Sequence, residues 1–156
     1  DIVQNPRLLV EGGAGTGKTL CAVDIAKMEA ARGKRVMLTC FNKKLEDSIR
    51  SMVDPDLGIT IVRIHNLCRE LVGEAGMNSL LFDRPESDEL YREIYPEAAR
   101  AAIKTLGAID SYDSIVMDEG QDIINNPECP YPRSILPVKI IECAFCNLQG
   151  CIKLAF

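Results

Sequence analysis

The stretch Gly12-Gly13-Ala14-Gly15-Thr16-Gly17-Lys18-Thr19 fits the pattern G-x-x-x-x-G-K-[S/T]. The apolar run Leu8-Leu9-Val10 before it predicts a short strand, and apolar residues at helical spacing after it predict a helix. A strand, a glycine-rich turn and a helix form a phosphate cradle, because the N–H groups of the turn and the positive end of the helix converge on one anion. The stretch therefore predicts a site for a nucleoside triphosphate. The alternative is a glycine-rich turn that binds nothing.

The residue types within this stretch suit the parts of such a cradle. Gly13, Gly15 and Gly17 allow backbone angles and close approaches that a Cβ would block. Lys18 supplies a mobile positive charge for the β- and γ-phosphates, and the Thr19 hydroxyl can ligate Mg²⁺. We therefore expect ATP and Mg²⁺ as cofactors, with the nucleotide bound by Gly12, Gly13, Ala14, Gly15, Thr16, Gly17, Lys18 and Thr19.

Length and composition predict one globular domain. The chain has 156 residues, of which 47% are hydrophobic. No segment approaches the roughly 18 unbroken apolar residues of a membrane span, and the first residues show no basic-then-apolar leader. The seven cysteines are an odd number, which favours reduced thiols over a disulfide framework. We expect a cytoplasmic protein without a membrane partner.

The net charge of −5 is unevenly distributed along the chain. Residues 1–53 carry nine Lys/Arg and six Asp/Glu, a balance of +3, whereas residues 54–128 carry six and sixteen, a balance of −10. Residues 129–156 carry three and one, a balance of +2. A polyanion should therefore contact mainly the N-terminal third of the chain.

Strand and helix patterns alternate over most of the chain. We expect strands at 7–11, 35–40, 59–64 and 114–117, and helices at 18–31, 42–52 and 65–72, with Asn42 capping the second helix. This alternation predicts right-handed βαβ units and a mostly parallel sheet. Residues 74–113 show no strand pattern and contain a helix-like run over 87–106, interrupted near Pro96, so we expect a helical insertion on the edge of the sheet.

Asp118 and Glu119 follow the strand predicted at 114–117. Open α/β sheets bind their ligands at the carboxyl ends of the strands. A P-loop also needs an acid to hold Mg²⁺ and a base to activate the attacking water, tasks that suit Asp118 and Glu119 respectively. A Glu beside Asp118 favours water as acceptor, hence hydrolysis over kinase-type transfer. Two acids that merely end a strand are the alternative.

Four motifs in register resemble the UvrD/Rep-like helicases of superfamily 1. The P-loop and Asp118-Glu119-Gly120-Gln121-Asp122 are similar to motifs I and II of that family, and the D-E-x-Q-D form is much more specific than a bare D-E. The segments Thr39–Leu45 and Thr60–Cys68 are similar to motifs Ia and Ib. The resemblance covers residues 7–122. It implies an α/β, P-loop NTPase fold of the RecA-like three-layer type.

The resemblance also implies individual roles. Lys18 and Glu119 would act in catalysis, Thr19 and Asp118 would bind the metal, and Gln121 would sense the γ-phosphate. The single-stranded DNA path would include Phe41, Asn42, His65 and Asn66, and RNA is not excluded. From spacing alone, His65 equally suits a helix cap or the edge of a core, and Lys43-Lys44 suits a solvated face.

The departures from the family limit this interpretation. Gln4 is too close to Gly12 to be the adenine-reading glutamine, and no motif III is visible. The arginine fingers of the family come from a second RecA-like lobe, which the 34 residues after Asp122 cannot contain. We therefore expect an N-terminal ATPase lobe over residues 1–124, with its insertion at 74–113, and a tail over 125–156 with one further strand near 138–141. Alone, this lobe should hydrolyse ATP very slowly, and it needs a second lobe as partner.

Three alternatives stay open. An ATP-gated nucleic-acid-binding or regulatory module would use the same motifs without unwinding, and DNA-stimulated hydrolysis separates it from a motor. A small phosphotransferase is disfavoured because Glu119 and Gln121 suit a water nucleophile.

In the tail, Cys143 and Cys146 with Cys129 and Cys151 offer four thiols for zinc, but their irregular spacing favours buried free thiols.

Overall fold

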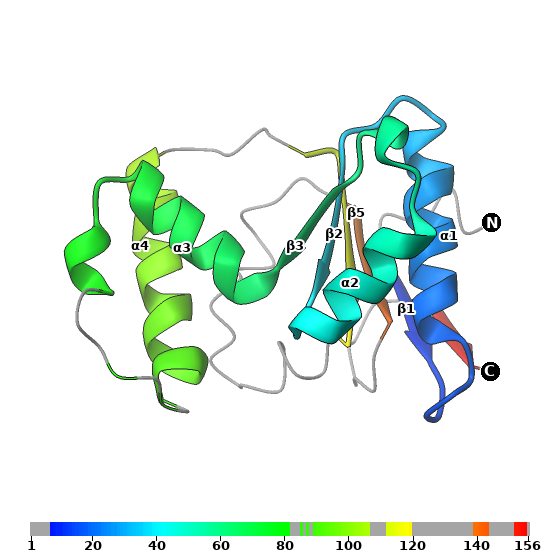
Figure 1. Ribbon diagram of the computed structural model, residues 1–156, viewed down its shortest axis with the longest axis horizontal. Coiled ribbons are helices and arrows are strands. Elements are labelled where there is room, and N and C mark those ends of the chain that lie inside the picture. The colour runs from blue at the N-terminus through cyan, green and yellow to red at the C-terminus, as the bar shows by residue number, and fades with distance from the viewer. Residues whose placement is uncertain are drawn as a thin grey trace.

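The chain folds around one parallel sheet. The structure is a computed structural model, and it describes residues 7–81, 85, 87, 89–106, 112–119, 139–143 and 152–155. In these ranges six strands, all paired in parallel, lie in the order β3-β2-β4-β5-β1-β6 (Figure 1). They are β1 Arg7–Glu11, β2 Val36–Cys40, β3 Thr60–Arg63, β4 Ser114–Asp118, β5 Lys139–Cys143 and β6 Ile152–Ala155. The predicted fold class, an α/β P-loop NTPase fold with a parallel sheet, is confirmed.

Four α-helices lie in the described ranges. They are α1 Lys18–Ala30, α2 Lys43–Met52, α3 Ile64–Glu74 and α4 Tyr95–Leu106, with short 3₁₀ turns at Pro55–Leu57 and Asn78–Leu80. Asn42 caps α2 as predicted, because its Oδ1 accepts a hydrogen bond from the Leu45 N–H at 2.9 Å. Within the described ranges, no helix is both long and apolar enough to cross a bilayer.

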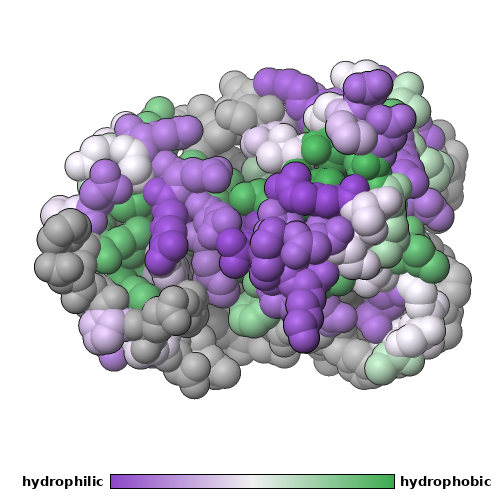
Figure 2. Space-filling model, in the orientation of Figure 1, coloured by the Kyte–Doolittle hydropathy of each residue, from purple (hydrophilic) through white to green (hydrophobic). Residues whose placement is uncertain are grey.

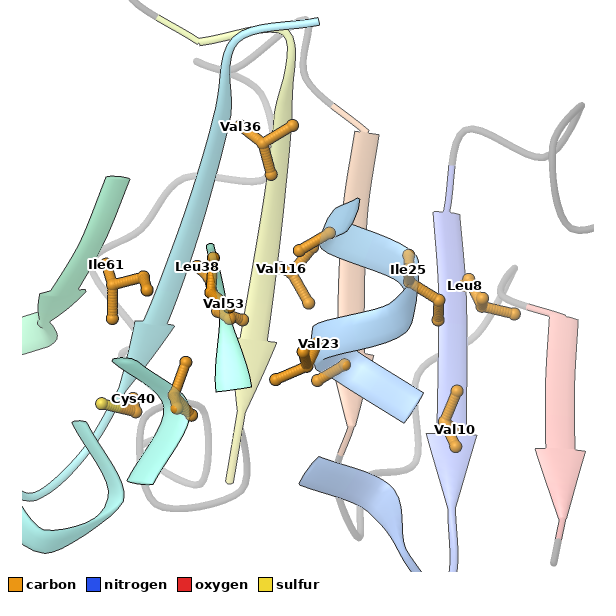
Figure 3. Close-up of a cluster of buried hydrophobic side chains, with 13 residues drawn as sticks. Leu8, Val10, Val23, Ile25, Val36, Leu38, Cys40, Val53, Ile61 and Val116 are labelled. Carbon is orange, nitrogen blue, oxygen red and sulfur yellow. The ribbon is translucent and has the colours of Figure 1, made fainter. Parts of the chain in front are cut away.

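The main core lies between the sheet and the helices α1 and α2, which cover the same face (Figure 1). Figure 3 shows β2 and β4 facing α1 through Leu38 and Val116, while Val23 and Ile25 project from the helix. Both strands are buried along their whole length, which is why the sequence shows continuous apolar runs there and no alternation. Figure 2 shows hydrophilic side chains over α2, whose outer face is exposed. This arrangement fixes α1, and with it the P-loop, against the centre of the sheet.

A second core joins α3 to α4 beyond the edge strand β3 (Figure 1). It comprises the buried side chains of Cys68, Leu71, Val72, Leu90, Tyr95, Ala98, Ala99 and Ala102. We call α3, α4 and the residues between them the helical unit. The insertion was predicted on an edge of the sheet, without saying which one, and it was predicted to start at residue 74. The structure instead packs α3 against α4, so the unit begins directly after β3.

Two helix boundaries differ from the sequence prediction. The helix expected to end before Gly73 continues through it to Glu74, since packing against α4 outweighs the modest cost of one glycine. The interruption expected near Pro96 is a π-helical turn at Leu90–Ile94, after which α4 begins at Tyr95. The π-helical turn shifts the backbone hydrogen bonds directly before Pro96, with the Tyr95 N–H bonded to the Leu90 carbonyl, at the point where proline offers no N–H.

The segment after residue 124 contributes two strands to the sheet. The strand predicted near 138–141 is confirmed as β5, whereas β6 was not predicted. β5 lies between β4 and β1, with Ile140 opposite both Ile115 and Arg7. The strand β5, from the tail, therefore separates β4, which ends at the acidic pair, from β1, which leads into the P-loop. The domain boundary at residue 124 stays a prediction.

Candidate functional site

Parallel pairing brings the candidate residues to one edge of the sheet. All strands of the sheet end on the lower side in Figure 1, and the P-loop follows β1 there. Asp118 is the last residue of β4, Phe41 follows β2, and His65 is the second residue of α3 directly after β3. Chain segments that are far apart in sequence thus meet along this carboxyl edge, as the strand pattern predicts.

The P-loop has the backbone of a phosphate cradle. Gly15 and Gly17 have φ angles of 77° and 86°, which side chains with a Cβ rarely adopt. Gly17 precedes α1 without a side-chain cap, so the first N–H groups of the helix are left to other acceptors. Within the loop, the Thr16 hydroxyl donates to the Gly13 carbonyl at 2.9 Å. The turn is therefore shaped by glycine conformations and by its own hydrogen bonds.

Lys18 lies over this turn. Its Nζ donates to the carbonyl oxygens of Gly12 and Gly13, each at 2.9 Å. The ammonium group is thus held at the mouth of the loop, close to where an anion would meet the N–H groups of the turn. An anionic phosphate is a stronger acceptor for this cation than the two neutral carbonyls.

Asp118 and Thr19 form the oxygen-rich part of the site. Asp118 is fully buried, and its Oδ2 has no hydrogen-bond partner within the described ranges. Burial raises the pKa of Asp118, and the Glu119 charge adds to this, while a hydrogen bond with Thr19 and the Lys18 charge lower it. A buried carboxylate oxygen without a partner beside a hydroxyl fits Mg²⁺, which prefers hard oxygen ligands. The predicted metal pair is thus compatible with the ion.

Glu119 has an unusual backbone conformation. Its φ is +57°, and in the described ranges it is the one residue other than glycine with a positive φ. Its N–H donates to Asp118 Oδ1 at 3.2 Å. Such a conformation costs of order 1–3 kcal/mol and clusters at functional sites. It turns the half-buried Glu119 away from the strand direction at the carboxyl edge. Gln121, the predicted γ-phosphate sensor, lies outside the described residues.

The four predicted nucleic-acid residues have different surroundings. Phe41, 36% exposed, meets His65 edge to face with ring centroids 5.3 Å apart. Asn42 uses its side-chain oxygen to cap α2, and Asn66 is half-buried in α3. Burial, followed by the charges of Arg63 and Arg69, lowers the pKa of His65. The structure thus brings Phe41 and His65 into contact, and it uses the Asn42 side chain as the N-cap of α2.

Sequence reasoning missed the charged groups around this aromatic pair. Glu46 of α2 is buried, and its carboxylate lies 2.9 Å from Arg50 and 3.0 Å from Arg63 of β3. Arg69 and Tyr95 contact each other between α3 and α4. The (i, i+4) spacing of Glu46 and Arg50 was a signal for the first group. No local pattern indicated a partner for Arg69, because Tyr95 belongs to another helix.

The described cysteines are reduced thiols. Cys21, Cys40 and Cys68 form no disulfide, and Cys40 and Cys68 are buried. Burial, together with nearby carboxylates, raises the pKa of Cys40 to about 11, so this thiol is inert at neutral pH. Cys129, Cys146, Cys151 and the Cys143 side chain lie outside the described residues. The zinc hypothesis for the tail therefore stays untested.

These features together define a P-loop nucleotide-binding domain of helicase-like type. A family model described as an AAA domain matches residues 1–127. The chain belongs to this AAA domain family. No curated protein matches the sequence at a significant level.

Proposed function

We propose that this chain is the ATP-hydrolysing lobe of a superfamily 1 helicase-like protein that acts on single-stranded DNA. The observation that carries the proposal is that Lys18, Thr19 and Asp118 lie at the same carboxyl edge of the sheet as Phe41 and His65. The AAA domain match supports the nucleotide half. The Phe41–His65 contact supports the nucleic-acid half.

The chemistry follows from the chain's own residues. The N–H groups at the start of α1 and the Lys18 ammonium hold the triphosphate and offset the negative charge that develops on its γ-phosphate. Thr19 and Asp118 would hold Mg²⁺, which neutralises phosphate charge when bound. Glu119 accepts a proton of the attacking water while the water oxygen bonds to the γ-phosphorus. The bond between that phosphorus and the bridging oxygen breaks, and the oxygen leaves with ADP. Gln121 is proposed to sense the γ-phosphate.

Nucleotide and nucleic acid would be coupled through the strands that they share. Asp118 ends β4, and its neighbour β2 ends directly before Phe41. Because β4 and β2 are neighbours, a movement of Asp118 on nucleotide binding would reach Phe41 and His65 through one adjacent strand. We propose that a second RecA-like lobe supplies an arginine to the γ-phosphate, since such a residue contributes about 10³–10⁵ in rate.

The test measures ATP hydrolysis by the purified protein at increasing concentrations of oligothymidylate. Turnover that rises with the oligonucleotide supports the proposal, and turnover that ignores it supports an ATP-gated or regulatory module instead. Because the lobe alone is expected to be slow, single-turnover hydrolysis of radiolabelled ATP is the suitable readout. A protein that binds neither Mg·ATP by calorimetry nor oligothymidylate by anisotropy would contradict the proposal altogether.

A further inference from the structure

Four side chains form a continuous row from the sheet edge to the helical unit. Phe41 contacts His65 with ring centroids 5.3 Å apart, and His65 lies 5.8 Å from the Tyr95 ring. The Arg69 guanidinium carbon lies 5.5 Å from the centroid of the same ring. His65 and Arg69 are (i, i+4) neighbours on α3, whereas Phe41 follows β2 and Tyr95 begins α4. The row therefore joins three separate parts of the chain.

Arg69 is oriented by Tyr95 rather than by an acid. Its Nε donates to the Tyr95 hydroxyl oxygen, and its charge faces the ring. In the described ranges, no carboxylate forms an ion pair with Arg69, and its Nη groups donate no hydrogen bond. Tyr95 is only 2% exposed, so its ring is a fixed support, while Arg69 itself is exposed.

Such an arginine differs from the other arginines near this edge. Arg50 and Arg63 both pair with the buried Glu46, and Arg35 pairs with Asp113. Their guanidinium groups are already engaged by carboxylates, which compete with any incoming anion. The Arg69 Nε is held by Tyr95, and its two Nη groups donate no hydrogen bond in the described ranges. A guanidinium with both Nη groups available can bind a phosphate in a bidentate manner.

We propose that Arg69 binds a backbone phosphate of the single-stranded nucleic acid, with Tyr95 as its positioning residue. The site extends the proposed path from Phe41 and His65 onto the helical unit, and it rests on the proposed function. A base stacked against Phe41 and a phosphate at Arg69 would lie at the two ends of one row of side chains. Stacking and phosphate contact are the two modes by which proteins bind single strands without reading sequence.

The local electrostatics favour this site despite the acidic composition of the region. Residues 54–128 carry a balance of −10, so most of the helical unit should repel a polyanion. Around His65, however, two arginines lie close by: burial lowers the pKa of His65, and the charges of Arg63 and Arg69 lower it further. A strand would therefore be accepted at this row and repelled elsewhere on the unit, which would fix its direction of exit.

The test compares variants by fluorescence anisotropy with labelled oligothymidylate over a series of salt concentrations. Arg69→Ala should weaken binding by about 10-fold, as expected for loss of a charge-assisted contact, and reduce the salt slope by about 0.7. Arg69→Lys should restore the slope but not the affinity, because it keeps the charge and loses the fork. Tyr95→Phe keeps the ring and removes the oxygen that orients Arg69. It should weaken binding by about 3-fold with an unchanged slope, since only preorganisation is lost.

Lys104→Ala is the matched control. It also removes one positive charge from the helical unit, but from the last turn of α4, at the other end of that helix from Tyr95. It should leave the affinity and the slope unchanged. If the parent binds and Arg69→Ala keeps the full affinity and slope, the inference is wrong while the proposed function stands. If Lys104→Ala lowers the slope as much as Arg69→Ala, the contact is diffuse and the assigned site is wrong. A parent that does not bind the oligonucleotide overturns the proposed function and this site together.

Discussion

The two ends of the carboxyl edge are built by different means. At the nucleotide end, eight consecutive residues shape the loop through glycine conformations and backbone hydrogen bonds, and Asp118 completes the site. At the other end, the row of Phe41, His65, Tyr95 and Arg69 is assembled from three separate elements. A local loop tolerates changes elsewhere in the fold, whereas an assembled row depends on how α3 and α4 pack. The predicted effects of substitutions differ accordingly.

The largest expected effect is on catalysis at the nucleotide end. Glu119→Gln keeps size and hydrogen bonding but removes the proposed base, so single-turnover hydrolysis should fall by roughly 10²–10⁴-fold. ATP affinity, measured by calorimetry, should stay within about 3-fold of the parent, since the substitution leaves the loop intact. Hydrolysis at the parental rate would assign the base to another residue.

Lys18→Ala should almost abolish nucleotide binding. Charge-assisted hydrogen bonds contribute up to about 3 kcal/mol, so the affinity for Mg·ATP should fall by roughly 100-fold. The fold should persist, because in the described ranges the half-buried Lys18 donates its hydrogen bonds to two loop carbonyls and belongs to no core cluster. Lys27→Ala, near the other end of α1, is the control with the same charge change and should bind like the parent. Equal calorimetric affinity of both variants would remove Lys18 from the site.

Asp118→Asn should separate stability from function. A carboxyl whose pKa is raised by folding stabilises the fold while it is protonated, and this contribution is lost as pH rises through the folded-state value. At neutral pH the buried charge therefore destabilises the protein, and the neutral amide should give an equal or higher melting temperature without ligand. Mg·ATP at 100 times its Kd should stabilise the parent by about 2.7 kcal/mol in free energy of unfolding. This stabilisation should be much smaller in the variant. A clear loss of stability without ligand would contradict this account.

The smallest effect concerns two neighbouring lysines near the proposed nucleic-acid path. Lys43 donates to Asp47 at 2.6 Å and lies 3.8 Å from Glu46, whereas Lys44 is exposed and has no ion pair in the described part of the chain. Neutralising both should lower the salt slope of oligothymidylate binding, with Lys44→Ala contributing about 0.7 and Lys43→Ala much less. Equal slopes for Lys44→Ala and the parent would place the N-terminal contact elsewhere.

Most features of the nucleotide end could be predicted from the sequence. Glycines and a Lys-Thr pair between a strand and a helix specify a local backbone shape, and Asn42 specifies a helix start, so both were predictable from neighbouring residues. The parallel strands then placed Asp118 on the same edge. The positive φ of Glu119 was not predictable, because only the surrounding fold can hold a non-glycine residue in that conformation.

The other end of the edge and the completion of the sheet depend on tertiary packing. Arg69 and Tyr95 are 26 positions apart, and their contact exists because α3 and α4 bury one common core. Likewise β5 lies between β4 and β1, a position that depends on pairing with strands far away in the sequence. Local patterns encode backbone conformation and periodicity, whereas pairing between distant segments is selected by the free energy of burying their apolar faces together.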